Sequence, residues 1–275
     1  MNVENYFIRL FQNPNTVIGD DGAIKGSYVY SKDLFFENVH FKRSWLTPYQ
    51  IGYKAMIVNI SDAIAMNAIP KYALLGVGMP KTFSLNEMEE LSRGIKDAAQ
   101  LYGIEIIGGD TIANAKLDIS ITIISALEEK PLTRYGLKNG DIIAYTGTIG
   151  KSNRQLHYLF ANGSVHHKHR FVKPTLRADF IRGSSRYLRA GMDISDGLFS
   201  DLQKICSLNK KSASLNKKIS KSHGCSGEEY EMLVVYSPRN AYAVQCQARR
   251  ARTSLNTIGF VRNGKFINRC KAHHF

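Results

Sequence analysis

Long apolar runs and a signal-peptide pattern are not found in this sequence. No apolar run reaches the ~18 residues that suggest a transmembrane helix. The N-terminus, MNVENYFIRLFQNPN, lacks the basic and then apolar order of a signal peptide. We therefore expect a cytoplasmic protein with no membrane partner.

Cysteine is scarce, and its spacing carries no metal or redox motif. The four cysteines all lie in the C-terminal third, and none forms a CxxC pair; they are Cys206, Cys225, Cys246 and Cys270. Neither a zinc ribbon nor a redox-active dithiol is indicated by such spacing. We expect reduced thiols, as is usual for a cytosolic protein.

Two widespread nucleotide-binding signatures are also absent. The sequence contains no GxxxxGK[ST] pattern, and it does not combine a Gly-rich loop with HRD and DFG motifs. If the chain binds ATP, it does so through another architecture.

The formal net charge of +14 is unevenly distributed along the chain. Residues 1–142 contain 14 Lys and Arg against 16 Asp and Glu, whereas residues 143–275 contain 23 against 7. A basic half favours an anionic partner, such as a nucleic acid, a phosphorylated metabolite or a membrane surface. No RNA-recognition or helix-turn-helix pattern accompanies the charge, so we do not expect a nucleic-acid partner.

Apolar periodicity predicts strands alternating with helices. The expected strands are 26–36, 72–79, 104–107, 117–127, 141–146, 192–194, 232–236 and 257–261, and the expected helices are 49–66, 85–102, 175–189, 197–208 and 239–251. Residues 209–224 are basic and serine-rich, which favours a loop or disorder. The pattern indicates an α/β or α+β protein with two lobes, which we expect at residues 1–142 and 143–275.

Aspartates beside glycine or serine recur in similar settings along the chain. The five segments are GDDG (19–22), SKD (31–33), NISD (59–62), GGD (108–110) and DISDG (193–197). Taken singly, such a motif is typical of a turn. Clustered carboxylates repel one another unless cations neutralise them, and Mg²⁺ is usually held by a few carboxylates and substrate phosphates. Together the five segments predict a site for Mg²⁺ and phosphate.

In their order, these motifs resemble the thiamine-monophosphate kinase family. The matching segments are GDDGA (19–23), SKD (31–33), NISDAIAMNAIP (59–70), IIGGDT (106–111), LTRYGLKNGD (132–141), DISDGLFSDL (193–202) and SGEEYEML (226–233). The resemblance runs from about Val17 to Leu233. It implies a two-lobed aminoimidazole ribonucleotide synthetase-like fold, with an N-terminal mixed sheet and a C-terminal α/β lobe. It also implies a homodimer and transfer of the γ-phosphate of ATP to thiamine monophosphate with several Mg²⁺ ions.

The resemblance further implies roles for individual residues. Magnesium would be bound by Asp21, Ser31, Asp33, Asp62, Asp110, Asp193 and Asp196. ATP would be contacted by Tyr102, Gly109, Asp110, Arg134 and Ser195, and thiamine monophosphate by His40 and Glu228. Arg134 and Asp196 would stabilise charge during the transfer. No protein nucleophile is expected, because a phosphate oxygen of the acceptor is already anionic near neutral pH.

Three departures separate this chain from the family pattern. Lys32 stands in the middle of the usual Ser-Thr-Asp motif, and Glu229 replaces an aspartate. The C-terminal lobe is short, with Ala272 about where an aromatic residue would pack on the thiamine ring. Three alternatives stay open: another ATP-dependent enzyme of the superfamily, a basic protein that binds anions or nucleic acid, and a chain that keeps the fold without activity.

Overall fold

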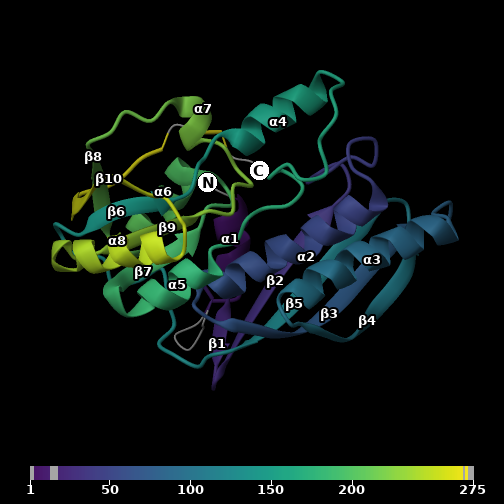
Figure 1. Ribbon diagram of the computed structural model, residues 1–275, viewed down its shortest axis with the longest axis horizontal. Coiled ribbons are helices and arrows are strands. Elements are labelled where there is room, and N and C mark those ends of the chain that lie inside the picture. The colour runs from purple at the N-terminus through teal and green to yellow at the C-terminus, as the bar shows by residue number, and fades with distance from the viewer. Residues whose placement is uncertain (1–2, 13–17, 269, 272–275) are drawn as a thin grey trace.

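The computed structural model describes residues 3–12, 18–268 and 270–271, and its strands form two five-stranded sheets (Figure 1). The first sheet has the order β1-β2-β5-β3-β4, and the second has the order β7-β9-β6-β10-β8. Every strand of the first sheet precedes residue 127, and every strand of the second follows residue 141. This arrangement confirms the expected α/β class. The boundary between domains at residues 142 and 143 stays a prediction.

The elements follow one another in the order that the periodicity predicts, with several additions. The strands are β1 (Ala23–Lys25), β2 (Tyr28–Phe36), β3 (Ile69–Pro80), β4 (Glu105–Asn114), β5 (Asp118–Ala126), β6 (Ile142–Thr146), β7 (Leu188–Asp193), β8 (Lys211–Leu215), β9 (Met232–Tyr236) and β10 (Leu255–Asn263). The helices are α1 (Val3–Arg9), α2 (Pro48–Ala65), α3 (Leu85–Leu101), α4 (Lys151–Phe160), α5 (Ala178–Ser184), α6 (Leu198–Leu208), α7 (Lys221–Gly224) and α8 (Ala241–Arg250), with short 3₁₀ turns at Ser185–Tyr187 and Pro238–Asn240. Among the described residues, no helix is long and apolar enough to cross a membrane.

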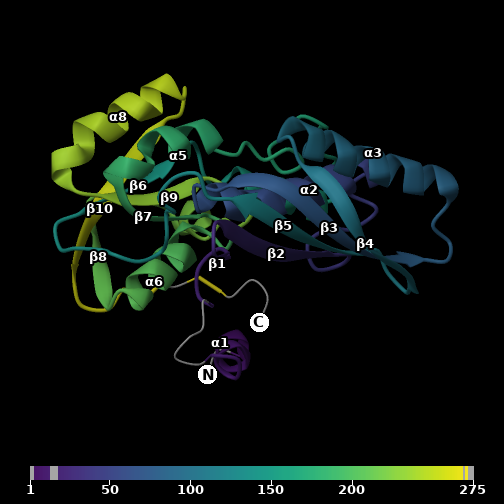
Figure 2. The same ribbon diagram turned by 90° about the horizontal axis from the view of Figure 1, so that it is seen from below.

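Helices α2 and α3 cover one face of the first sheet (Figure 2). Each begins with a capping box, in which the side chain of Thr47 or Ser84 accepts a hydrogen bond from a backbone N–H of the first turn. The two helices pack closely, since a Cβ on Gly94 would lie 2.1 Å from the carbonyl oxygen of Tyr49. Helix α2 is almost wholly buried because the second lobe covers its other side, where it contacts β7 and α5.

The other face of the first sheet is not covered by α2 or α3; helix α1 lies on that side, apart from the sheet (Figure 2). Along β2, Val29 and Phe35 are buried under the helices, whereas Tyr30 and Leu34 alternate with them and are exposed. Lys32 also points to this open face, where its ammonium donates a 2.6 Å hydrogen bond to Ser120 Oγ. The open face is therefore partly apolar.

The second sheet is covered on both faces (Figure 2). Helices α5 and α8 contribute Phe180 and Val244 to a core shared with α2, whereas α6 contributes Leu202 and Ile205 to a core on the opposite face. Strand β9 lies inside the sheet and is buried along its whole length. The carboxyl end of the neighbouring strand β7 is directed towards α2, which it contacts.

Three secondary-structure expectations are wrong in detail. Strand β4 runs straight through Gly108–Asp110, which were expected to connect two strands, because pairing with β3 continues as far as Asn114. Residues 209–224 are not a loop: they contain β8, which pairs with β10, and the short helix α7. The helix expected at 175–189 is shortened, because β7 already begins at Leu188.

The expectation of four reduced thiols is also wrong. Cys225, at the end of α7, forms a disulfide with Cys270 near the C-terminus, with 5.5 Å between their Cα atoms. Cys206 and Cys246 are free. Spacing along the chain does not reveal the pair, because 45 residues separate its two members.

Candidate functional site

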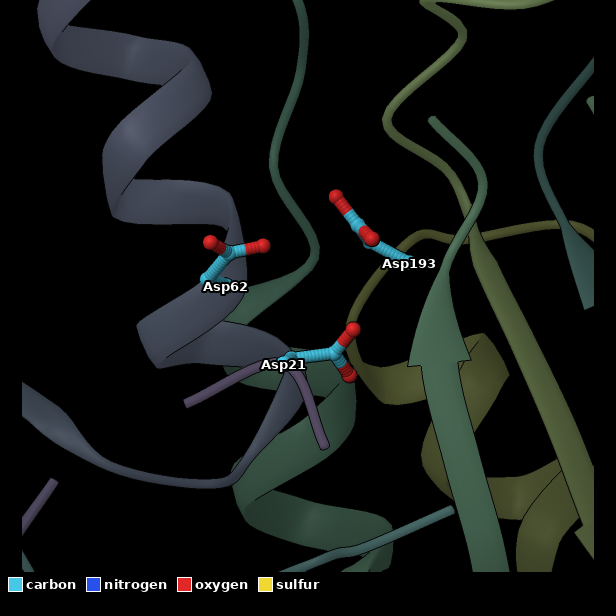
Figure 3. A group of neighbouring side chains, drawn as sticks. All are labelled: Asp21, Asp62 and Asp193. Atoms are coloured by element: carbon cyan, nitrogen blue, oxygen red, sulfur yellow. The ribbon is translucent and has the colours of Figure 1, made fainter. Parts of the chain in front are cut away.

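Three carboxylates meet where the two sheets approach each other (Figure 3). Asp21 comes from the turn before β1, Asp62 from the last turns of α2, and Asp193 from the end of β7. One oxygen of each lies within 4.8 Å of the others. Asp21 and Asp193 are buried, with exposed fractions of 9% and 2%. Carboxyl groups from three distant segments therefore share one small space.

The NISD segment of α2 holds this arrangement in place. Ser61 Oγ donates a 2.7 Å hydrogen bond to Asp193 Oδ2 and so fixes the carboxylate from the second sheet. Asn59 Oδ1 accepts a 2.8 Å bond from the backbone N–H of Asp33 on β2. Asp62 itself completes the group. One turn of helix thus positions carboxylates from both sheets.

Asp33 belongs to the same electrostatic cluster. It pairs across the sheet with the buried Ile121, so its side chain lies on the face that α2 covers. Burial raises its pKa to about 7, and the charges of Asp193 and Asp196 add to the shift. We call Asp20, Asp21, Asp33, Asp62, Asp193, Asp196 and Asp201 the aspartate cluster.

Burial and mutual repulsion raise the pKa values of several carboxyl groups in the aspartate cluster. Burial raises the pKa of Asp21 to about 7, opposed by Arg134 and reinforced by Asp193 and Asp20. The pKa of Asp62 is raised well above its ordinary value, again by burial first and then by repulsion from Asp33 and other aspartates. Such repulsion is relieved when a cation binds between the groups.

Two buried oxygens of the predicted metal ligands have no hydrogen-bond partner. They are Asp21 Oδ2 and Ser31 Oγ, and buried polar atoms are seldom left unpaired. Both atoms are hard oxygen donors of the kind that Mg²⁺ prefers. Together with the mutual repulsion of the aspartates, they fit a site for divalent cations.

Arg134 balances one side of the aspartate cluster. Its guanidinium forms an ion pair with Asp21, with Nε 3.1 Å from Oδ1, and its backbone N–H bonds both carboxylate oxygens of Asp20 at 3.2 Å. Asn209 Nδ2 donates to the Arg134 carbonyl at 2.8 Å and anchors the segment. The cationic side chain expected to contact ATP thus lies beside the proposed metal ligands.

The two residues expected to contact thiamine monophosphate are linked by packing. Lys54 of α2 is fully buried, and its ammonium lies 2.9 Å from Glu228 Oε2. The same ammonium stands 3.8 Å from the ring centroid of Phe171 and 5.8 Å from that of Phe35. The ring of His40 stacks on that of Phe35, with 5.6 Å between the ring centroids. His40 and Glu228 therefore approach one region, bridged by Phe35 and Lys54.

The EEYE segment sends successive side chains in different directions. Glu229 Oε1 accepts hydrogen bonds from the backbone N–H groups of Gly150 and Ser152, at 2.7 and 3.1 Å, and so caps α4. Glu231 is buried and pairs with Arg177 and Arg170. These two acids are structural, which leaves Glu228, whose side chain is 26% exposed.

Three of the predicted ATP and metal residues do not join the cluster. Asp110 pairs with Gly76 of β3, which lies on the same face of the sheet as the exposed Leu74. The Asp110 side chain therefore lies on the open face, opposite to that of Asp33. Gly109 lies on the same strand, β4, and a Cβ there would stand 1.8 Å from the Leu75 carbonyl oxygen. Tyr102 ends α3 on the helix-covered side, where burial and then Tyr53 raise its pKa to about 12.

The remaining predicted residues lie at the second sheet. Ser195 connects the two halves of the DISDG segment, and its carbonyl accepts a 2.7 Å hydrogen bond from the backbone N–H of Glu228. Asp196 forms an ion pair with Lys204. Sequence reasoning did not single out Lys54 or Lys204, because only the fold brings each to its partner. Ala272 lies outside the described residues.

Sequence comparisons identify similar proteins along most of the chain. The pattern of the family "AIR synthase related protein, N-terminal domain" matches residues 19–127. A thiamine-monophosphate kinase of Bacillus subtilis is 31% identical over 275 aligned residues, which cover 89% of this chain and 85% of that protein. The Aquifex aeolicus thiamine-monophosphate kinase is 33% identical over 195 residues, covering 67% of this chain and 63% of that protein.

Solved structures give the same result in three dimensions. The complex of AaThiL with AMPPCP and TMP superposes with a TM-score of 0.82 at 25% identity, covering 96% of this chain and 91% of that one. The hydrogenase maturation protein HypE, in its complex with HypF, shares the fold at a TM-score of 0.79 and 18% identity, over 95% of this chain and 93% of its own.

Without metal, the melting temperature should fall as the pH rises from about 4 to about 7. Asp21 and Asp33 titrate near 7 in the fold, against an ordinary value of 3.8. A folded-state pKa above the unfolded value stabilises the fold at low pH, and this stability is lost as the pH rises towards 7. Melting curves in EDTA measure the effect, and added Mg²⁺ should restore the melting temperature at pH 8.

Asp33→Asn should melt higher than the wild type at pH 8 in EDTA and respond less to pH, because one repelling charge is gone. Each kcal/mol gained in the free energy of unfolding raises the melting temperature by about 2–4 °C. Glu89→Gln, on the exposed side of α3, is the matched control and should leave the curve unchanged. A lower melting temperature for Asp33→Asn at pH 8 would contradict this account of the cluster.

Proposed function

This chain belongs to the thiamine-monophosphate kinase family, and from that premise we propose that its aspartate cluster holds the Mg²⁺ ions needed to transfer the γ-phosphate of ATP to thiamine monophosphate. The observation that carries the proposal is the convergence of Asp21, Asp62 and Asp193, with a buried carboxylate oxygen that has no partner. The family and fold make the chain an ATP-dependent kinase. The choice of metal and the role of each residue are our inference.

The proposed ligands are Asp21, Ser31, Asp33, Asp62 and Asp193, whereas Asp196, at the edge of the group, is paired with Lys204. Bound Mg²⁺ would supply positive charge that neutralises the phosphate oxygens during transfer. Arg134 adds a fixed positive charge on the Asp21 side. Ser61 and Asn59 keep the carboxylate of Asp193 and the backbone of Asp33 in place, so less reorganisation is needed when the substrates bind.

We place the acceptor beside His40 and Glu228. Lys54 bonds one oxygen of the Glu228 carboxylate, and the Glu228 side chain stays partly exposed. A carboxylate suits the positively charged ring of thiamine monophosphate, and the acceptor phosphate supplies its own anionic oxygen. The protein's task is therefore to align two phosphates rather than to remove a proton.

We also propose that two copies of the chain associate through the open face of the first sheet. Six large apolar side chains on that face are between 38 and 61% exposed: Tyr28, Tyr30, Leu34, Tyr72, Leu74 and Ile112. Contiguous exposed apolar surface is a sign of an interface. Asp110 projects from the same face, away from its own cluster. In a dimer, it would serve the site of the partner subunit.

We also propose that the protein is cytoplasmic, because the reaction uses ATP. The Cys225–Cys270 disulfide is unusual for such a compartment, so a thiol count of protein purified under non-reducing conditions is informative. Two free thiols correspond to the disulfide form.

The purified chain should convert ATP and thiamine monophosphate into thiamine diphosphate only when Mg²⁺ is present. Direct detection of thiamine diphosphate by chromatography tests this, with reactions lacking ATP or containing EDTA as controls. Asp62→Asn should lower turnover by about 100-fold or more, because it removes charge at the phosphate-transfer site. Its circular dichroism should match that of the wild type. A folded wild-type protein that binds Mg-ATP but forms no thiamine diphosphate would indicate another acceptor or an inactive chain.

Mixing two inactive variants tests whether the partner supplies Asp110. Asp62→Asn and Asp110→Asn should each be inactive alone, yet a mixed dimer contains one site with both native aspartates. Random mixing of equal amounts in a two-fold symmetric dimer should restore about one quarter of wild-type activity. The dimer of two Asp62→Asn chains, taken through the same refolding, is the matched control. If co-refolded mixtures stay inactive while mixed dimers are isolated, Asp110 acts within its own chain or not at all.

A further inference from the structure

We propose that Lys204 is a built-in counter-ion for Asp196, occupying the position that a divalent cation would otherwise take on that carboxylate. The proposal deepens the proposed function, on which it rests for the identity of the metal site. It predicts that the aspartate cluster, without nucleotide, binds one divalent cation fewer than it would if Lys204 were neutral. Lys204 is thus a residue that sets the metal requirement of the site.

Helix α6 brings Lys204 to two carboxylates at once. Its ammonium forms an ion pair with Asp196 Oδ2 and lies 3.4 Å from Asp201 Oδ1. Asp201 stands three residues earlier on the same helix, so the two side chains share one face. Asp201 is fully buried, and Lys204 places an ammonium within ion-pair distance of its carboxylate.

Asp196 is held through its backbone as well as its side chain. Asp201 Oδ2 accepts a 3.1 Å hydrogen bond from the Asp196 N–H, and Lys204 binds the carboxylate of the same residue. Asp196, Asp201 and Lys204 therefore form a compact unit at the start of α6. In this unit the lysine binds a residue that the family resemblance assigns to magnesium.

The charges on the two sides of the aspartate cluster are balanced differently. Arg134 pairs with Asp21, near the turn before β1, and Lys204 pairs with Asp196 and Asp201. Lys204 thereby performs on its side the electrostatic role of a bound cation.

Competition between the ammonium and a metal ion follows from where each must sit. The lysine ammonium is a compact charge on a flexible side chain. Because Lys204 is part of α6, this charge is always present beside Asp196, whereas a metal ion must bind from solution. Mg²⁺ gives up its water reluctantly and needs carboxylate oxygens that are available to it. The Lys204 side chain is 36% exposed, so it is able to swing away without unfolding α6.

The experiment counts Mn²⁺ ions, as a spectroscopic substitute for Mg²⁺, bound to the full chain without nucleotide. Electron paramagnetic resonance measures free Mn²⁺ during titration of the wild type, Lys204→Gln and Lys204→Arg. Lys204→Gln should bind one more Mn²⁺ per chain than the wild type. Lys204→Arg keeps the charge and should show the wild-type number. The double variant Lys204→Gln/Asp196→Asn should lose the additional ion.

Two further results keep the test decisive if Lys204→Gln folds poorly without metal. Asp196→Asn alone should bind as many Mn²⁺ ions as the wild type, since Lys204 already occupies that carboxylate. Where Lys204→Gln does fold, Mg²⁺ should raise its melting temperature more than that of the wild type. Equal Mn²⁺ counts for the wild type and Lys204→Gln, or loss of an ion in Asp196→Asn, would overturn the proposal. Metal counting is independent of the acceptor, so failure to form thiamine diphosphate would affect the proposed function alone.

Discussion

Repulsion among carboxylates gathered in a small, largely dry space is the constraint around which this molecule is organised. Helix α2 imposes it: buried between the two lobes, the helix contributes Asp62 and fixes Asp193 and Asp33 through Ser61 and Asn59. The apolar cores on both sides of the helix must offset the electrostatic cost of burying these carboxylates. Apart from a few polar residues, α2 is accordingly apolar along its length. The crowded carboxyl groups of the folded chain therefore favour the binding of cations, and with them of phosphates.

The same helix also couples the proposed metal side to the proposed acceptor side. Lys54 and Ser61 are seven residues apart, two turns along one face of α2, and they bind Glu228 and Asp193 respectively. Both partners come from the second lobe: Asp193 ends β7, and Glu228 lies just before the neighbouring strand β9. A shift of α2 would therefore move both halves of the site together, so their alignment depends on a single rigid element.

The sequence allowed the motifs to be recognised, but not every place where they meet. NISD on a helix and DISDG after a strand could be predicted, because apolar periodicity and Asp-Gly spacing are local properties. GGD at 108–110 was expected between strands, since glycine pairs are typical of turns. Its position inside β4 depends on pairing with β3, which local sequence does not encode. Lys54 and Glu228 are 174 residues apart, so only the fold reveals their contact.

Anomalous diffraction from crystals grown with Mn²⁺ and a non-hydrolysable ATP analogue tests the central claim most directly. We predict a manganese peak between Asp21, Asp62 and Asp193, about 2 Å from carboxylate oxygens, a distance typical of a small divalent cation. A second peak near the nucleotide phosphates is compatible with this result. Manganese bound only outside the three aspartates, with the nucleotide present, would contradict the assignment of the aspartate cluster as the metal site.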